Sequence, residues 1–228
     1  MTTYATSRGA ALERAYRHWR ERGALLELPS SKRITPPLTV AISRELGAGG
    51  GAIAQAVAKR TAWPLYDKEL VDQIAEDTGV NSQLLRQLDE TKPNWLAECL
   101  EGFSDQKKIS GGGFAIRLRK ILLALYCHGN CVILGRGAAQ LLPPESTLRI
   151  RLAAPKKFRV QQLSKLAGSP EEAERMITQS DNDRASFVKS YFCKDATSIE
   201  GYDLILDTSR FSQQGCADII CSALEARR

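Results

Sequence analysis

The sequence predicts an α/β fold in which a parallel five-stranded sheet carries helices on both of its faces. Short apolar runs rich in β-branched residues alternate along the chain with longer stretches of helical composition, and no internal repeat is visible. A glycine-rich segment directly follows the first of these apolar runs. The 228 residues are 43% hydrophobic and 25% charged, which is typical of a globular domain and excludes a disordered or collagen-like chain.

The strands are expected where apolar runs are short and bounded by turn residues. The run Leu38-Thr-Val-Ala-Ile-Ser43 is typical of a strand buried on both faces. The five expected strands are Leu38–Ser43, Trp63–Tyr66, Cys131–Leu134, Leu148–Leu152 and Tyr202–Asp207.

The helices are expected between these strands, because consecutive parallel strands need a crossover connection. Three glycines at 111–113 are expected to form a flexible joint. The expected helices are 52–60, 68–79, 82–88, from Pro93 toward Phe103, 114–127, 156–167, 170–191 and 213–227.

Residues 1–37 form a separate segment of helix and linker before the main domain at 38–228. Within it, residues 11–22 predict a short amphipathic helix with arginines opposite an apolar stripe. This helix either packs on the main domain or contacts a partner, for instance a second copy in a homodimer. Prolines at 29, 36 and 37 then interrupt the chain.

Charge and cysteine content narrow the class of protein. The net charge is +6, but residues 1–36 contribute +4 of it, since they hold seven Arg or Lys and three Asp or Glu. The main domain is therefore only slightly basic, and we expect no nucleic-acid partner. There is no run of 18 apolar residues and no apolar leader at the N-terminus, so neither a membrane span nor a secretory signal is expected. Six cysteines without a leader are typical of reduced thiols, and a cytoplasmic location is expected.

The segment Gly47-Ala-Gly-Gly-Gly51 lies between the first strand and a helix and predicts a phosphate site. Glycines let the backbone approach a phosphate, and the helix N-terminus offers N–H donors. Gly47-x-Gly49-x-x-Ala52 fits the dinucleotide fingerprint, with Asp67 following 20 residues later as a ribose-binding acid. The alternative is a P-loop in which Gly50 and Gly51 replace the usual lysine and hydroxyl. This segment alone favours the dinucleotide interpretation.

Five motifs in order from Leu38 onward resemble the cytidylate kinase-like family, which is related to the nucleoside monophosphate kinases. That family commonly has Ser-Arg-Glu-x-Gly-x-Gly-Gly in place of the ordinary P-loop, followed by a bulky polar residue where this chain has Gly51. The matching segments are Ala41–Gly50, Tyr66–Glu69, Val132–Gly137, Asp183-Arg184 with Tyr191-Phe192, and Tyr202–Arg210.

The resemblance implies a P-loop kinase-like fold that binds ATP and Mg²⁺. The backbone of Gly47, Gly49, Gly50 and Gly51 would hold the donor phosphates. Arg44 would supply the charge of the missing lysine, because a guanidinium is a forked phosphate donor. Ser43 is the nearest hydroxyl for a metal, although its position also suits a turn at the strand end; no metal ligand is identified.

The acceptor side is implied by two further matches. Arg136 resembles the arginine that binds the acceptor phosphate. The family has an acidic residue before the glycine and another after the arginine of its Gly-Arg motif, whereas this chain has Leu134 and Gly137 at these positions. Asp67 opens a segment, 67–110, that resembles the helical acceptor-binding insertion. Asp67 would orient the acceptor or, alternatively, cap the next helix. The family's second acceptor arginine, six residues on, is Gln73 here.

A lid is implied over about 156–195. Arg184 and Lys189 fall where such kinases place cations over the transferring phosphoryl group. Both positions also suit a solvated helix face, and Arg159 resembles the residue at the entry to the lid.

The resemblance therefore implies a phosphotransferase that moves the γ-phosphoryl group of ATP to a CMP-like nucleoside monophosphate or a similar small acceptor. Two alternatives remain from the residues themselves. One is a catalytically silent nucleotide-binding sensor, since the loop lacks both lysine and hydroxyl. The other is an NAD(P)-binding oxidoreductase built on the dinucleotide fingerprint.

Overall fold

The computed structural model describes residues 37–76 and 112–227. The amphipathic helix at 11–22, the helices at 82–88 and 93–103 and most of the insertion at 67–110 lie outside this range. The strands are β1 (Thr39–Arg44), β2 (Leu65–Tyr66), β3 (Val132–Leu134), β4 (Thr147–Ala153) and β5 (Leu204–Asp207). The helices are α2 (Gly50–Thr61), α3 (Lys68–Glu76), α6 (Gly112–His128), α7 (Ala138–Leu141), α8 (Lys156–Ala167), α9 (Pro170–Phe192) and α10 (Gln213–Glu225), with 3₁₀ turns at Pro144–Ser146 and Ile199–Gly201.

All five strands are parallel and lie in the order β2-β3-β1-β4-β5. The predicted α/β class and five-stranded parallel sheet are confirmed. This order also decides between the two phosphate motifs. In the dinucleotide-binding fold the first strand pairs with the second, whereas here β3 separates β1 from β2. Asp67, at the end of β2, is therefore not on the strand next to the glycine loop, and the dinucleotide interpretation is wrong.

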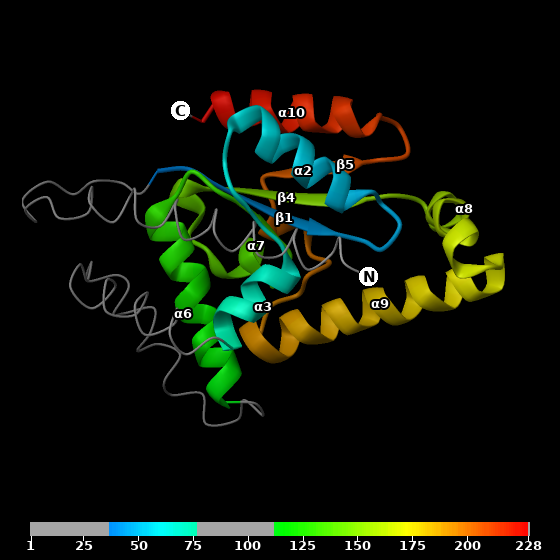
Figure 1. The fold of residues 1–228 in the computed structure, drawn as a ribbon, viewed down its shortest axis with the longest axis horizontal. Helices are drawn as coiled ribbons and strands as arrows, with labels where there is room; N and C mark the ends of the chain where they lie inside the picture. Colours follow the sequence, from blue (N-terminus) through cyan, green and yellow to red (C-terminus); the bar gives the residue numbers. More distant parts are fainter. Residues whose placement is uncertain (1–36, 77–111, 228) are drawn as a thin grey trace, which may run out of the picture.

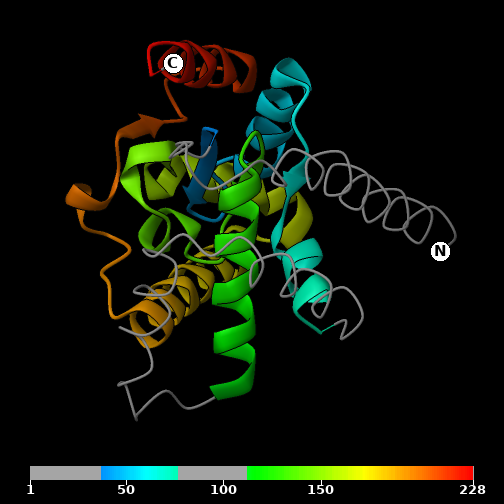
Figure 2. The same ribbon diagram turned by 90° about the vertical axis from the view of Figure 1, so that its left-hand side faces the viewer.

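Helices cover both faces of the sheet, as Figures 1 and 2 show. The helices α2 and α10 lie on one face, and α3, α6, α7 and α9 lie on the other. The side chains of β1 alternate between these layers: Val40 and Ile42 pack with α2 and α10, and Ala41 packs on the opposite side.

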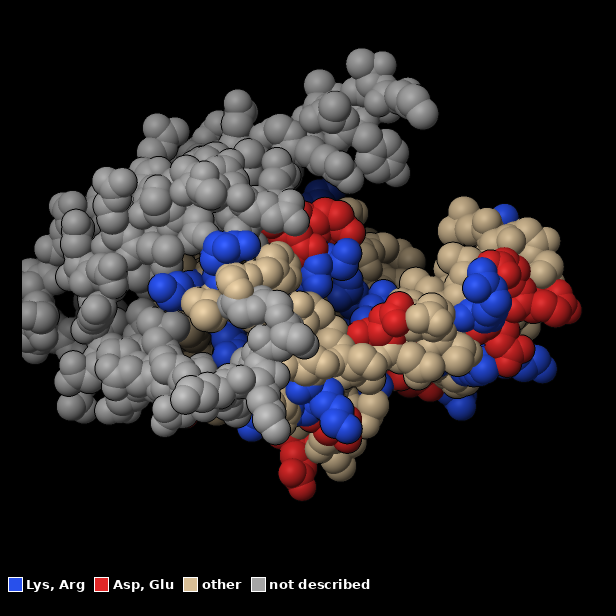
Figure 3. Space-filling model, turned by 90° about the horizontal axis from the view of Figure 1, so that it is seen from below, with Lys and Arg blue, Asp and Glu red and all other residues tan. Residues whose placement is uncertain are grey.

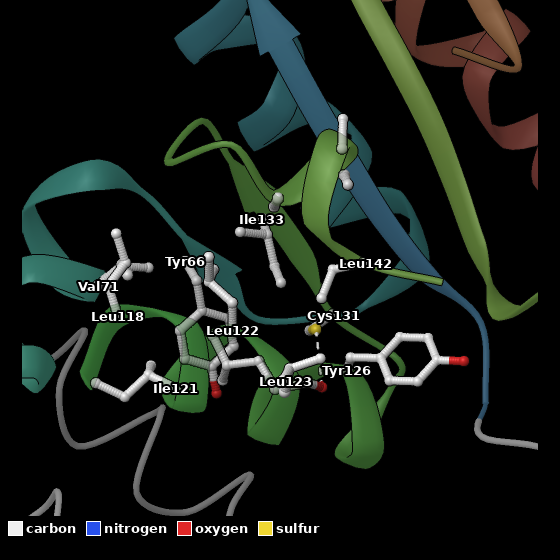
Figure 4. Packing of buried hydrophobic residues seen from close by; sticks show 14 of the residues in the cluster. Tyr66, Val71, Leu118, Ile121, Leu122, Leu123, Tyr126, Cys131, Ile133 and Leu142 are labelled. Carbon is white, nitrogen blue, oxygen red and sulfur yellow. Dashed lines mark hydrogen bonds between the residues drawn. The ribbon is translucent and has the colours of Figure 1, made fainter. Parts of the chain in front are cut away.

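The core of the second face is built on α6. Its Leu118, Ile121 and Leu122 pack against Tyr66 of β2 and Ile133 of β3, and all five side chains are buried (Figure 4). Burial of large apolar side chains stabilises the fold by roughly 1.5–3 kcal/mol each. This packing fixes β2 and β3, and with them the loops that follow these strands.

Local sequence signals set the helix ends. The Ser169 hydroxyl accepts a hydrogen bond from Glu172 N at the start of α9, with Pro170 in the first turn. Ser212 caps α10 in the same way through Gly215 N. The expected joint at 111–113 is wrong at Gly112 and Gly113, because both belong to the first turn of α6. The helix α7 was not predicted, because its four residues are too few to show a helical period.

Candidate functional site

The loop between β1 and α2 forms a phosphate-sized cradle. Gly47 has a φ of 84°, and a Cβ there would lie 2.9 Å from Cβ of Arg159. Gly49 caps α2 with a φ of 72° and no side-chain hydrogen bond. No acidic residue occupies the first turn of α2. The N–H groups at this helix end, with the positive end of the helix dipole, therefore suit an anion.

A pocket of about 320 Å³ opens beside this loop. The predicted phosphate-binding glycines all line it, and the Arg44 and Arg184 side chains come from two other elements. The lining residues are Arg44–Gly47, Gly49–Ala52, Gln162, Leu163 and Arg184.

The Arg44 side chain runs from the glycine loop to the loop after β3. A Cβ on Gly50 would lie 2.7 Å from its Cγ, and a Cβ on Gly135 would overlap its Nη1. Both neighbours must therefore be glycine for the arginine to lie in this position. Its guanidinium has no hydrogen-bond or ion-pair partner in the part of the chain that the structure describes. Burial, followed by the charges of Arg184 and Arg136, lowers the pKa of Arg44 to about 10.

Arg184 reaches the same pocket from α9. Its Nη1 donates a hydrogen bond to the carbonyl oxygen of Arg44 at 3.0 Å, and it lies 3.9 Å from the Asp181 carboxylate. Burial is the main cause that lowers its pKa. Two partly desolvated cations thus share one pocket, and a bound anion would relieve their mutual repulsion.

A second set of charges holds the backbone of the loop. Arg159 Nη1 lies 2.5 Å from Oδ2 of Asp181 and donates to the carbonyl oxygen of Leu46 at 3.3 Å. Oδ1 of Asp181 accepts from Leu46 N at 3.1 Å. Glu45 Oε1 accepts from Arg151 Nη2 at 2.9 Å, and Glu45 Oε2 lies 3.4 Å from Arg159 Nε. Arg159 is buried, its Nε and Nη1 are engaged by the loop and by Asp181, and it is not among the pocket residues, so it holds the loop in place.

The loop after β3 presents Arg136. Gly135, Arg136 and Gly137 all have positive φ values, of 85°, 53° and 69°. A left-handed conformation costs a non-glycine residue about 1–2 kcal/mol. This backbone conformation directs the Arg136 side chain toward α3 and α9. There it pairs with Asp72 of α3, and its guanidinium lies 4.9 Å from the ring centre of Phe187.

Asp67 stands at the start of α3, where Oδ1 accepts a hydrogen bond from Leu70 N at 2.9 Å. The residue is thus a helix N-cap. Its charge and that of Glu69 both raise the pKa of Arg44, against the larger effects of burial and Arg184. Asp67 therefore belongs to the same electrostatic neighbourhood as the pocket.

Ser43 and Lys189 are not among the pocket residues. The Ser43 position alternates with Arg44 along β1, on the face that carries Ala41. Lys189 is exposed on α9 and lies roughly 140° around the helix from Arg184, because five residues exceed one helical turn. The structure therefore brings together Arg44, Arg184 and the four glycines, with Arg136 and Asp67 close by.

Sequence reasoning missed two residues that contact Arg136, which are Asp72 and Phe187. Phe187 lies three residues after Arg184 on the same side of α9 and stacks on Tyr191 at 4.4 Å between ring centres. The spacing from Arg184 could have indicated that both face the sheet edge. Seen from below, basic and acidic side chains lie next to one another at the middle of this face, and the lobe formed by α8 and the start of α9 projects to one side (Figure 3).

The described residues contain neither a metal-binding cluster nor a membrane-spanning helix. Between 37 and 76 and between 112 and 227, no group of three His, Cys, Asp or Glu is arranged to hold a metal ion. Over the same residues, no helix is long and apolar enough to cross a membrane.

Comparisons with known proteins agree with this geometry. The matched relatives include a cytidylate kinase from Pyrococcus abyssi strain GE5, 25% identical over 190 residues, which are 82% of this chain and 94% of that protein. A cytidylate kinase from Methanopyrus kandleri strain AV19 is 34% identical over 108 residues, but the match spans only 43% of this chain and 56% of that enzyme.

A solved structure of similar fold is an uncharacterized protein from Eubacterium ventriosum ATCC 27560. It aligns with a TM-score of 0.63 and 23% identity over 83% of this chain and 98% of its own. The sequence profile of the cytidylate kinase-like family matches residues 39–210, from β1 to the loop after β5. The match covers most of the chain, and the chain therefore belongs to the cytidylate kinase-like family.

Proposed function

We propose that the protein transfers the γ-phosphoryl group of ATP to a nucleoside monophosphate of the cytidylate type. The observation that carries this proposal is the course of Arg44, which spans from the glycine loop to the loop that holds Arg136. A cation in that position lies between a donor phosphate on the glycine loop and an acceptor near Arg136. The names of the two relatives, both cytidylate kinases, support the choice of acceptor class.

Arg44 would replace the lysine of an ordinary P-loop. In phosphoryl transfer, the protein mainly positions the reactants and stabilises charge on the transferring group. A guanidinium offers a planar fork of donors, so one arginine can contact oxygens of two phosphates. Arg184 adds a second cation from α9, and the N–H groups of Gly49, Gly50 and Gly51 would hold the donor phosphates. Closure of the segment 156–195 as a lid would exclude water from these groups.

Magnesium would enter the site on the phosphates of ATP, because Mg²⁺ keeps several waters and needs one or two carboxylates. The described residues fit this limited role at Asp67, whose second carboxylate oxygen has no hydrogen-bond partner among them. Glu45 is less suited, because both of its oxygens contact arginines. A bound ion would neutralise charge on the oxygens between the β- and γ-phosphates.

The direct test is a coupled assay of ADP formation with Mg-ATP and each of CMP, dCMP, UMP, AMP and GMP. Turnover with CMP or dCMP above the rate without acceptor is the expected result. The Lys59→Ala variant, which removes an exposed cation from α2 away from the pocket, serves as the matched control and should keep full activity. If all five acceptors fail while ATP still raises the melting temperature, the proposal is wrong.

That last result is the signature of the second candidate, a silent nucleotide-binding sensor. The observation in its favour is Gly51, the second residue of α2, where a Cβ would meet nothing within 4 Å. The loop thus offers space but no hydroxyl or long polar side chain at the helix start.

A further inference from the structure

Arg136, the cation that would bind the acceptor, already forms an ion pair within the protein. Arg136 Nη2 donates to Oδ2 of Asp72, and the two side chains are 13% and 21% exposed. Phe187 lies over the guanidinium on one side. Asp72 also lies 3.9 Å from the exposed Lys68, a much looser contact. The Asp72 carboxylate is therefore the first anion that Arg136 meets.

The pairing is incomplete in a specific way. Arg136 Nε and Asp72 Oδ1 are both buried, and neither has a hydrogen-bond partner among residues 37–76 and 112–227. These two atoms are the second half of the fork that a guanidinium forms with a carboxylate or a phosphate. Nε of Arg136 therefore remains available to an anion that binds both Nε and Nη2.

The Arg136–Asp72 pair and Arg44 differ in how much positive charge they leave available to a ligand. Arg44 and Arg184 keep their charge available to the donor pocket, whereas the charge of Arg136 is cancelled by Asp72. A phosphate dianion that approaches Arg136 meets a carboxylate in its place, and like charges repel strongly when both are largely removed from water.

We propose that Asp72 is a specificity-determining residue that occupies Arg136, so that an acceptor phosphate binds only by replacing the Asp72 carboxylate. This inference rests on the proposed function, because it assigns the acceptor phosphate to Arg136. It predicts that the acceptor site excludes phosphate compounds whose contacts with the protein are too weak to displace the Asp72 carboxylate. Asp72 acts through Arg136 and is a positioning residue.

The test compares CMP with cytidine, which lacks the phosphate, by calorimetric titration of the whole protein. Asp72→Asn keeps the shape of the side chain and removes its charge. The affinity for CMP should rise at least about tenfold, while that for cytidine stays within about twofold. The double variant Asp72→Asn/Arg136→Gln should lose the gain, because the released cation is gone. Asp218→Asn, which removes an exposed carboxylate paired with Arg60 on α2 and α10, controls for net charge and should change neither affinity.

Asp72→Ser is measured beside Asp72→Asn, so that a folding defect of one variant does not end the test. The inference is overturned if Asp72 variants that melt cooperatively bind CMP no more tightly than the wild type, or more weakly. Weaker binding of CMP by these variants would mean that Asp72 orients Arg136 for the phosphate. Failure of the proposed function looks different: ADP formation is absent with every acceptor, while the gain in CMP affinity on removal of Asp72 is still seen.

Discussion

Two sets of arginines contact the glycine loop, one that lines the pocket and one that does not, and their partners differ. In the pocket, Arg44 has no partner among the described residues and Arg184 makes one hydrogen bond to a backbone oxygen. Outside the pocket, Arg159 contacts Asp181, Glu45 and the carbonyl oxygen of Leu46. The satisfied arginine fixes the shape of the loop, and the unsatisfied ones leave charge for a ligand. Residue type alone does not separate these roles, but the partners do.

The largest expected effect is on stability, at Arg159. Arg159→Ala leaves Asp181 with only the looser contact to Arg184 at 3.9 Å, and it leaves Oε2 of Glu45 without its cation in a largely buried position. The free energy of unfolding should fall by about 3–5 kcal/mol, as for other broken buried pairs. Urea denaturation at neutral pH measures it. Arg175→Ala, which removes an exposed ion pair with Glu172, should leave the midpoint unchanged. A comparably small change for Arg159→Ala would contradict the distinction between the two sets.

The next effect concerns activity, at the pocket. Arg44→Ala should lower kcat by about 10²–10³-fold, which is typical when one preorganised donor to the reacting group is lost. The melting temperature at pH 7 should not fall. The fold lowers the pKa of Arg44 to about 10, so keeping this arginine charged costs stability in full below about pH 10, and the cost shrinks as the pH rises from 10 toward the ordinary pKa of arginine.

The measurement is steady-state kinetics with the preferred acceptor, together with thermal unfolding of the same samples. Arg44→Lys should recover part of the rate, since it restores a cation without the fork. Unchanged turnover in Arg44→Ala would remove Arg44 from the role proposed here.

A smaller effect is expected at Gly135, where the backbone makes room for Arg44. Gly135→Ala combines a φ of 85° with an overlap with Nη1 of Arg44. The cost in stability should be about 1–2 kcal/mol, and the affinity for ATP should weaken as the guanidinium moves. Thermal shift with Mg-ATP reports both. Gly201→Ala, where a Cβ meets nothing within 4 Å, is the control and should behave as the wild type. Equal behaviour of the two variants would show that the close approach of Arg44 is not required.

The smallest effect is a gain at Gly51. Its φ is not in the left-handed region and a Cβ has open space, so alanine removes unfolded-chain entropy without a clash. Gly51→Ala should raise the free energy of unfolding by about 0.5–1 kcal/mol. A loss of stability would indicate that the N-terminus of α2 needs the freedom of glycine, and chemical denaturation decides it.

Much of the fold could be predicted from the sequence because its signals are local. The apolar run of β1, the Ser-Pro-Glu-Glu start of α9 and the glycines before α2 each specify a structure within a few residues. The strand order could not be predicted in this way. Whether β3 or β2 lies next to β1 depends on packing between α6 and the sheet, which joins residues more than 50 positions apart.

The candidate site shows the same limit. The glycines and Arg44 are adjacent in sequence, so their proximity to one another could be predicted. The pairing of Arg136 with Asp72 and the role of Arg159 could not, because each depends on which of several nearby charges comes into contact. Lys189 lies five positions after Arg184, and helix geometry alone places it on another side of α9.

The 23 residues of α9 form one rod, roughly 35 Å long, that touches both halves of the site. Its Asp181 and Arg184 meet the glycine loop, and one turn later its Phe187 covers Arg136. A stiff helix cannot adjust one of these contacts independently of the other. If binding at one subsite fixes the position of this helix, thermodynamic linkage makes the effect mutual, so that each ligand changes the affinity for the other by the same factor. Binding at the two subsites should be synergistic, and the synergy should be mutual.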